Sequence, residues 1–391
     1  MPIVNRVADL QPDIQAWRRD IHQHPELLYD VHRTAAFVAD RLREFGCDEV
    51  VTGLGKTGVV GVIKGKKGPA KGEGLKVIGM RADMDALPVE EQTNLPYASK
   101  IPGKMHACGH DGHTAMLLGA ARYLAETRNF AGDAVVIFQP AEEGGAGGAA
   151  MVKDGLMERF GIDQVYGMHN GPGIPIGSFA IRPGPIMAAT DEVDIMIEGV
   201  GGHAARPHRC VDSVLVGAQV ITALQSIVAR SVDPLESAVI SICEFHAGNA
   251  RNVIPQTAEL RGTVRTLTRE VRDLIEKRVR EVVDGVAKMT GAKIDLTYER
   301  GYPVTVNHEA QTEFASRIAR EVAGEASVHD MAPLMGGEDF AYMLEARPGA
   351  FIFCGNGDSA GLHHPAYNFN DEAIVYGTSY FVKIVENALA A

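Results

Sequence analysis

Three histidines and one cysteine stand within eight consecutive residues, His-Ala-Cys-Gly-His-Asp-Gly-His at positions 106 to 113. Cys108 and His110 are two positions apart, so in an extended or looped segment both side chains can turn toward one centre, whereas a helix would direct them apart. Thiolate and imidazole groups are typical ligands of zinc and related cations. The segment therefore predicts a metal site, carried by a tight loop.

Further candidate ligands stand downstream, each after a run of apolar residues. Glu142 and Glu143 follow one such run, His169 closes a second, and the pair His363-His364 lies in a loop after a third. We expect only one of the two C-terminal histidines to face a metal. Together with the first cluster, these residues supply enough ligands for two divalent metal ions.

The adjacent carboxylates Glu142 and Glu143 suit metal-assisted hydrolysis. They come from an irregular segment after a predicted strand, so the two side chains can point in different directions. One can bind a cation while the other acts as the general base that takes a proton from the attacking water. On a surface loop such a pair would be a solvated acidic patch, but the apolar run before it and the glycines after it favour the catalytic interpretation.

Cys108 has two alternative roles. Because histidines flank it, it could be the nucleophile of a Cys-His hydrolase, or it could be a buried structural residue. The surrounding imidazoles and carboxylates favour a metal ligand, since a cation keeps the thiol deprotonated and offsets the local negative charge.

Composition narrows the class of protein. The chain has 391 residues, 46% of them hydrophobic and 23% charged, which is the composition of a soluble globular protein with room for two domains. Its net charge of −12 is not accompanied by a stripe of Lys and Arg that would bind nucleic acid. Without a signal-peptide pattern or an apolar segment of about 18 residues, we expect a cytoplasmic protein that does not bind membranes. The five cysteines include no Cys-x-x-Cys pair, which argues against a disulfide framework.

Helical and extended patterns alternate up to residue 187, as in a layered α/β domain. The expected helices are 7–22, 33–45, 114–127 and 147–154, and the expected strands are 58–63, 76–81, 134–138 and 164–168. The candidate ligands then fall at strand ends and in the loops after them, which is where open α/β sheets bind their ligands.

From residue 188 the order changes to strand, helix, strand, strand, helix, strand, which is the ferredoxin-like βαββαβ pattern. These elements are expected at 191–198, 212–230, 238–246, 257–266, 269–289 and 293–299. After Tyr302-Pro303, the alternation of helical and extended patterns resumes, and further candidate ligands follow. We therefore predict that residues 188–301 form a domain inserted into a discontinuous catalytic domain of residues 1–187 and 302–391.

Seven ordered blocks of sequence extend this interpretation. They are Arg81–Pro88, Met105–His113, Gln139–Gly144, Gly201–Ala204, Asn252–Pro255, Gly336–Phe340 and His363–Pro365. With these blocks the chain resembles the aminoacylase and carboxypeptidase family of metallohydrolases, and within it the branch of hippurate hydrolases and auxin-conjugate amidohydrolases. The resemblance covers nearly the whole chain. It implies a zinc-exopeptidase-like α/β/α catalytic domain with an inserted lid or dimerisation domain.

The resemblance also implies roles for individual residues. Cys108 would bridge two metal ions, and the remaining metal ligands would be His110, Glu143, His169 and His363. Glu142 would be the catalytic acid and base. Asp83 and Cys108 take the places of a histidine and a bridging carboxylate of the wider family, and Asp85 is a candidate for orienting the ligands. The metals would be zinc or manganese, with cobalt or nickel also compatible with these ligands.

In the inserted domain, the resemblance implies that His203 reaches the active site of a partner subunit, in a homodimer formed through the lid domain. There it would stabilise the carbonyl oxygen as charge develops, while Asn252 and Arg265 would hold a substrate oxygen or carboxylate. Judged alone, His203 could also be a solvated loop residue, and Arg265 could belong to a surface ion pair.

The expected reaction is hydrolysis of the amide bond of a small N-acyl-L-amino acid, hippurate-like or N-acetylated, to a carboxylic acid and a free amino acid. The alternatives are a biosynthetic N-acetyl-diaminopimelate deacetylase, an inactive metal-bound relative that binds peptides, and a thiol-based redox protein. Glu142 argues against an inactive relative, because such a protein has no need of a second carboxylate beside the ligand. A redox protein that uses Cys108 would keep its activity after chelation and lose it on alkylation.

Overall fold

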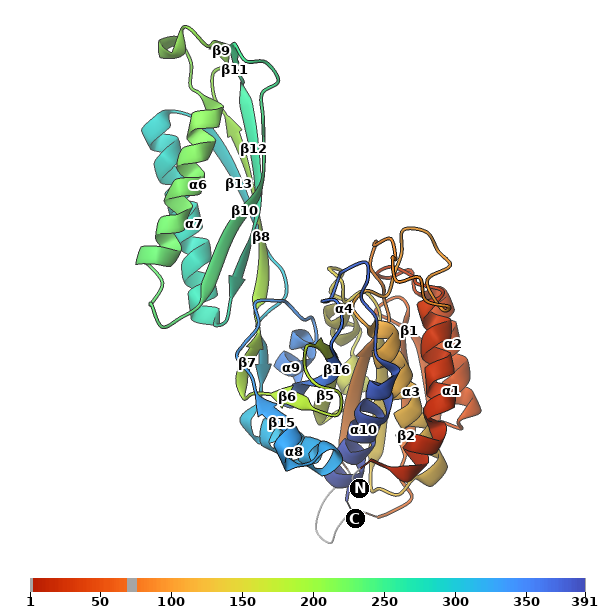
Figure 1. Ribbon diagram of the computed structural model, residues 1–391. Helices are drawn as coiled ribbons and strands as arrows, with labels where there is room; N and C mark the ends of the chain where they lie inside the picture. Colours follow the sequence, from red (N-terminus) through yellow and green to blue (C-terminus); the bar gives the residue numbers. More distant parts are fainter. Residues whose placement is uncertain (1–2, 69–75, 391) are drawn as a thin grey trace. The chain divides into compact units, whose positions relative to one another are not determined.

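The computed structural model describes residues 3–68 and 76–390, which form two compact units (Figure 1). Unit 1 contains the described residues of Met1–Ile186, Val306–Ala332 and Asp339–Ala391, and unit 2 contains Met187–Thr305 and Pro333–Glu338. The junctions therefore lie at 186/187 and 305/306, where the sequence predicted 187/188 and 301/302. The short segment 333–338 was expected in the catalytic domain, but it pairs with the start of unit 2 through a bridge between Met187 and Leu334.

Unit 1 is built on one eight-stranded sheet with the order β1-β2-β4-β3-β5-β16-β6-β15. In chain order the strands are β1 (Glu49–Leu54), β2 (Gly58–Lys64), β3 (Val77–Asp83), β4 (Asp133–Gln139), β5 (Gln164–Pro172), β6 (Phe179–Ile181), β15 (Val328–Asp330) and β16 (Gly349–Gly357). The four central strands, β4, β3, β5 and β16, run parallel to one another. Their carboxyl ends therefore meet at one edge of the sheet, where α/β folds place their sites.

Helices cover both faces of this sheet, which confirms the predicted α/β class. They are α1 (Asn5–His22), α2 (His32–Glu44), α3 (His110–Thr127), α4 (Gly147–Lys153), α5 (Leu156–Arg159), α8 (Glu309–Ala323), α9 (Ala341–Ala346) and α10 (Ile374–Ala388). Val136 of β4 belongs to the core cluster that includes α1, α3 and α10, while its neighbours Val135 and Ile137 are equally buried outside that cluster. Since side chains alternate along a strand, both faces of β4 are covered.

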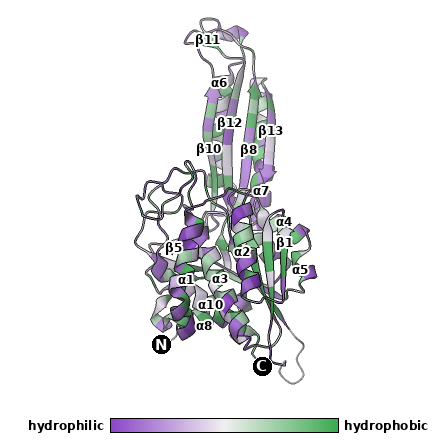
Figure 2. Ribbon diagram, turned by 90° about the vertical axis from the view of Figure 1, so that its right-hand side faces the viewer, coloured by the Kyte–Doolittle hydropathy of each residue, from purple (hydrophilic) through white to green (hydrophobic). Residues whose placement is uncertain are grey.

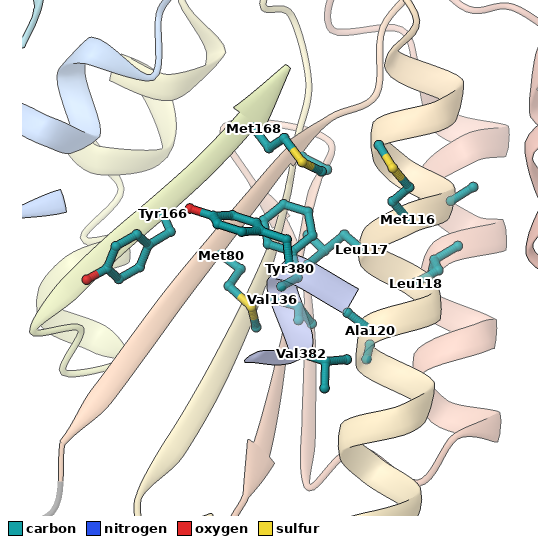
Figure 3. Close-up of a cluster of buried hydrophobic side chains, with 14 of the residues drawn as sticks. Met80, Met116, Leu117, Leu118, Ala120, Val136, Tyr166, Met168, Tyr380 and Val382 are labelled. Carbon is teal, nitrogen blue, oxygen red and sulfur yellow. The ribbon is translucent and has the colours of Figure 1, made fainter. Parts of the chain in front are cut away.

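Figure 3 shows the main core between α3, α10 and the parallel strands, where Met116 and Leu117 of α3 lie near Met168 of β5. Close packing of this kind fixes the position of α3 relative to the strand ends. The start of α3 is thereby held at the edge where the candidate ligands gather.

Unit 2 has the βαββαβ element order that the sequence predicted. Its elements are β8 (Ala189–Glu198), α6 (Ser213–Arg230), β10 (Ala238–Ala247), β12 (Thr257–Thr266), α7 (Arg269–Thr290) and β13 (Lys293–Arg300). The antiparallel sheet has the order β10-β12-β8-β13. Buried and exposed residues alternate along β8, and Figure 2 shows the same alternation in the hydropathy colours of the strands. One face of the sheet therefore packs on the core of unit 2, and the other face is directed outward.

β7 (Gly184–Met187) and β14 (Thr305–Asn307) lie at the two junctions, and β9 (Gly202–His203) pairs with β11 (Val253–Ile254) in unit 2. In the described part of the chain, α6 alone is long and apolar enough to qualify as a membrane span. This is weak evidence, because Val216, Val220, Leu224 and Ile227 of α6 pack in the core of unit 2.

Candidate active site

The turn between Cys108 and His110 differs from the predicted loop, because His110 is already the first residue of α3. Gly109 makes the turn with a left-handed φ of +89°, and a Cβ at this position would overlap the Asn170 amide. Only glycine fits both requirements. The turn places Cys108 before the helix and His110 within it, and ligand atoms of both residues and of His169 lie within 4.8 Å of one another.

The other predicted ligands surround the same turn. His169 lies inside β5, which continues to Pro172, and not at the strand end that the sequence predicted. Its Nε2 is 3.4 Å from the Cys108 Sγ. The Glu143 Oε1 lies 3.8 Å from the His110 Nε2 and 3.5 Å from the His363 Nε2. Cys108 thus belongs to two ligand groups, one with His110 and His169 and one with Glu143 and His363.

His363 and its neighbour His364 point to different partners. His363 donates its backbone N–H to the Ala107 carbonyl at 2.8 Å and has a left-handed φ of +65°. His364, which is exposed as His363 is, accepts a hydrogen bond from the Ala366 N–H at its Nδ1 instead. Of the two, His363 is therefore the one that contributes to the cluster.

The polar atoms of this cluster suit a divalent cation. The Nδ1–H of His110 donates to the Asp85 carbonyl at 2.8 Å, which directs the Nε2 into the cluster as the atom that would bind a cation. Among the described residues, the His110 Nε2 and the Glu143 Oε1 are buried without a hydrogen-bond partner. Buried polar atoms left in this state are costly. A cation bound by sulfur, nitrogen and oxygen donors would satisfy both atoms.

The protein environment works against an ionised Cys108 when no cation is bound. Burial and the carboxylates of Glu143 and Glu142 raise the pKa of the Cys108 thiol well above its usual value. Burial alone would lower the pKa of His110, but Asp83 and the other nearby carboxylates outweigh it and raise the pKa to about 10. A free thiolate nucleophile is therefore disfavoured, whereas a bound cation would displace both protons.

We accordingly expect metal binding at pH 7 to release protons from the Cys108 thiol and the His110 imidazolium, with a further contribution from His363, whose pKa is raised by its hydrogen bond to Glu143. Apparent affinity should rise with pH, because Cys108 and His110 stay protonated at neutral pH in the metal-free protein. Calorimetric titration in buffers of different ionisation enthalpy measures the proton count. Binding without proton release would contradict this assignment of the ligands.

Glu142 is oriented through its backbone and its side chain. The Asp85 carboxylate accepts the N–H groups of Glu142 and Glu143 at 2.9 and 3.1 Å, so one side chain fixes both glutamates. The Asp339 N–H donates to the Glu142 Oε1 at 3.4 Å. Glu142 therefore sits beside Glu143 with its own set of contacts, although one of its carboxylate oxygens also lies within 4.8 Å of ligand atoms of His110 and Glu143.

A buried charge network that the sequence reasoning missed lies behind these carboxylates. Arg81 contacts Asp83 at 2.7 Å and Asp339 at 2.9 Å, and none of the three side chains is exposed. Gln139 links the same groups, accepting from Arg81 and donating to Asp339. Arg81 and Asp339 both belong to sequence blocks noted above, but their pairing spans most of the chain and has no local signal.

The three candidate residues of unit 2 do not lie together. His203 and Asn252 are neighbours, since β9 pairs with β11 and the Ala204 N–H donates to the Asn252 carbonyl at 3.0 Å. Arg265 pairs with Thr190 at the other end of β8. With about 3.3 Å per residue, a distance of roughly 26 Å along β12 separates Arg265 from the end of the sheet that leads to His203.

Residues 79–387 match the model of peptidase family M20/M25/M40. The chain belongs to this family. The hippurate hydrolase of Campylobacter jejuni is 44% identical over 388 residues, which are 98% of each protein. An N-acetyl-L-cysteine deacetylase of Bacillus subtilis is 43% identical over 380 residues, covering 96% of this chain and 88% of that protein. The crystal structure of the Bacillus subtilis YxeP protein, a dinuclear metal binding peptidase, matches with a TM-score of 0.84 and 35% identity, over 98% of this chain and 99% of that one.

These comparisons confirm the family resemblance predicted from the sequence blocks. The M20/M25/M40 match begins at Gly79 in β3 and extends beyond His363, so it includes every candidate ligand described above. The helices α1 and α2 and the strands β1 and β2 precede the matched region. One of these helices, α1, nevertheless contacts the start of α3 beside the ligands.

In this M20/M25/M40 chain, α1 supports α3 through buried charges. Arg18 of α1 contacts Asp111 of α3 at 3.3 Å, and the His22 Nδ1 lies 2.8 Å from the same carboxylate. Burial lowers the pKa of His22, but Asp111 outweighs it and raises the pKa to about 9. Asp111 directly follows His110, so α1 is tied to the turn that carries the ligands.

We expect the His22–Asp111 pair to make folding stability depend on pH. The pKa of His22 rises from 6.5 to about 9 on folding, so its contribution is complete below pH 6.5 and is lost as the pH rises through 9. A His22→Gln variant should lack this component, which is on the order of 1–3 kcal/mol. Urea unfolding of both proteins at several pH values measures the difference. Parallel stability profiles for the two proteins would contradict the assignment.

Proposed function

We propose that this chain is a metal-dependent amidohydrolase that cleaves N-acyl-L-amino acids to a carboxylic acid and a free amino acid. The observation that carries the proposal is the pair of ligand groups that share Cys108, with Glu142 held beside them by Asp85 and Asp339. Full-length relatives that are 43% and 44% identical, a deacetylase and a hippurate hydrolase, support the choice of an amide of an amino acid as substrate.

The proposed reaction assigns two metal ions to the shared cluster. The ligands would be Cys108 in both groups, with His110 and His169 on one side and Glu143 and His363 on the other. Bound cations of this kind polarise an amide carbonyl and lower the pKa of water. Zinc or manganese suits this mixture of thiolate, imidazole and carboxylate, and cobalt and nickel are compatible with it.

Glu142 would perform both proton transfers. Its carboxylate takes a proton from the attacking water and then delivers that proton to the nitrogen of the leaving amino acid, as a general base and acid. The Asp339 N–H on Oε1 and the Asp85 bond to the Glu142 backbone keep this carboxylate in one place during the two steps. A fixed carboxylate needs little reorganisation as the reaction proceeds.

His203 would act from the partner subunit of a homodimer formed through unit 2. Its Nδ1 accepts the Ala205 N–H at 3.1 Å, so the ring proton lies on Nε2 and can be donated to an oxyanion. Asn252 lies beside it and would hold a substrate oxygen, whereas Arg265, which lies apart, would bind a substrate carboxylate from a different position. The exposed apolar residues Val214 and Leu215 of α6 support the dimer, since burial on a second copy would remove them from water.

This arrangement can be tested by mixing two inactive variants, Glu142→Gln and His203→Ala. A mixed dimer contains one site with an intact Glu142 from one subunit and an intact His203 from the other. If subunits exchange at random, the mixture should recover about a quarter of the wild-type activity. Recovery that stays at the level of the separate variants would contradict the action of His203 across the dimer.

The proposed function itself is tested with hippurate, a panel of N-acetyl and N-benzoyl amino acids, and N-acetyl-diaminopimelate. We expect turnover of one or more N-acyl amino acids that stops on chelation and returns with added Zn²⁺ or Mn²⁺. Turnover of N-acetyl-diaminopimelate alone would favour a biosynthetic deacetylase, and no turnover in metal-loaded protein would contradict the proposal. We also place the enzyme in the cytoplasm, which is supported by five free cysteines.

A further inference from the structure

The main chain of Asn170 contacts two imidazoles of the site. Asn170 follows His169 in β5 and is 1% exposed. Its carbonyl accepts the Nδ1–H of His169 at 2.8 Å, and its N–H donates to the Nε2 of His113 at 2.9 Å. Since a backbone N–H can only donate, His113 carries its own proton on Nδ1, which it donates to Asp83 at 2.6 Å. His113 is therefore occupied as a neutral link between Asn170 and Asp83.

The side chain of Asn170 contacts the other half of the site. Its Nδ2 donates to the Cys108 carbonyl at 2.6 Å, and its Oδ1 accepts the hydroxyl of the buried Tyr367 at 2.8 Å. A Cβ on Gly109 would overlap both the Asn170 amide and the Tyr367 hydroxyl, so these groups pack directly on the turn after Cys108. The donor and acceptor of the amide are both used, which fixes its orientation.

We propose that Asn170 is the positioning residue that sets the placement of Cys108 relative to His169. The inference rests on the proposed function, in which both residues bind metal. Their ligand atoms are 3.4 Å apart but come from segments that are far apart in the chain. Asn170 fixes the ring of His169 with its main chain and the peptide after Cys108 with its side chain. Supporting residues of this kind typically change metal affinity by roughly 10- to 100-fold.

The test is a titration of metal-free protein with Co²⁺ alone. Asn170→Asp keeps the size of the side chain and an acceptor for Tyr367, but it places a carboxylate oxygen against the Cys108 carbonyl. We expect its Co²⁺ affinity to fall by roughly 10- to 100-fold, with a changed thiolate-to-cobalt absorption band. Tyr367→Phe leaves the bond to Cys108 intact and should lose less affinity than Asn170→Asp.

Asn307→Ala provides a matched control. Asn307 is 2% exposed, and its amide bonds to the main chain of Arg182 and Phe351, away from every candidate ligand. This variant should lower the unfolding temperature but keep the wild-type affinity for Co²⁺. Unchanged affinity and absorption in Asn170→Asp would overturn the inference, and so would an equal loss in Asn307→Ala. If the wild type itself binds no Co²⁺, the proposed function fails too, and that result is read before any variant is compared.

Discussion

Replacing Glu142 with Gln is expected to lower kcat by about 10²- to 10⁴-fold, the range usually contributed by a general acid and base. The amide keeps the size of the side chain and can still accept the Asp339 N–H, but it cannot take a proton from water. Since Glu143 and the other ligands are unchanged, metal content and KM should stay close to wild type. Steady-state kinetics together with elemental analysis of the purified variant measure the three quantities.

Glu143→Gln is the matched control for this prediction. Its Oε1 lies between His110 and His363, so the amide should weaken metal binding, and added metal should restore part of the activity. Glu142→Gln should not respond to added metal. If the two variants behave alike, or if Glu142→Gln keeps wild-type turnover, the separate roles of the adjacent carboxylates are wrong.

Replacing Arg81 with Met is expected to lower the free energy of unfolding by about 3–5 kcal/mol, because it leaves buried carboxylates without their counter-charge. Asp83 and Asp339, the two carboxylates concerned, are fully buried on either side of the guanidinium. Urea unfolding followed by tryptophan fluorescence measures the loss of stability of unit 1, which contains Arg81. The chain has one tryptophan, Trp17, which lies in α1 of unit 1.

The control for Arg81→Met is Arg317→Met on the surface of α8. Arg317 pairs with Glu321 at 2.9 Å, but both side chains are about half exposed. Such pairs contribute about 0–1 kcal/mol, so this variant should unfold near the wild-type midpoint. A stability loss in Arg81→Met as small as that in Arg317→Met would contradict the importance assigned to the buried network.

Most of the residues that gather in the candidate site could be selected from the sequence, because their signals are local. Cys108 and His110 stand in one segment, and Glu142 and His169 each follow an apolar run of sequence that forms one of the parallel strands. The helix that begins at His110 was missed, since nothing in the composition of residues 106–113 shows that Gly109 takes a left-handed turn against Asn170. Local patterns select candidate ligands more readily than they show the backbone that carries them.

The supporting residues could not be predicted, because their partners are distant in sequence. In the sequence, Asn170 is only a polar residue after a histidine. Its contacts are with Cys108 and Tyr367, which only the folded chain brings together. The sequence also gives no sign that Arg265 and Asn252, both expected to hold substrate groups, are separated by the strand register. The six residues 333–338 were expected in the catalytic domain but belong to unit 2. The cause is again a contact between distant parts of the chain, the bridge between Leu334 and Met187.

The order of strands in unit 1 has a consequence for synthesis of the chain. β16 lies between β5 and β6, although it is made after all of unit 2, including the segment 333–338. At about 5–20 residues per second, the apolar edge of β5 waits on the order of ten seconds or longer for its partner strand. His363 is made later still, so the ribosome-bound chain has an unpaired strand edge and an incomplete set of ligands. We therefore expect that the metal site is completed only after the segment carrying His363 has been made, and that the open edge of β5 is prone to aggregation until β16 pairs with it.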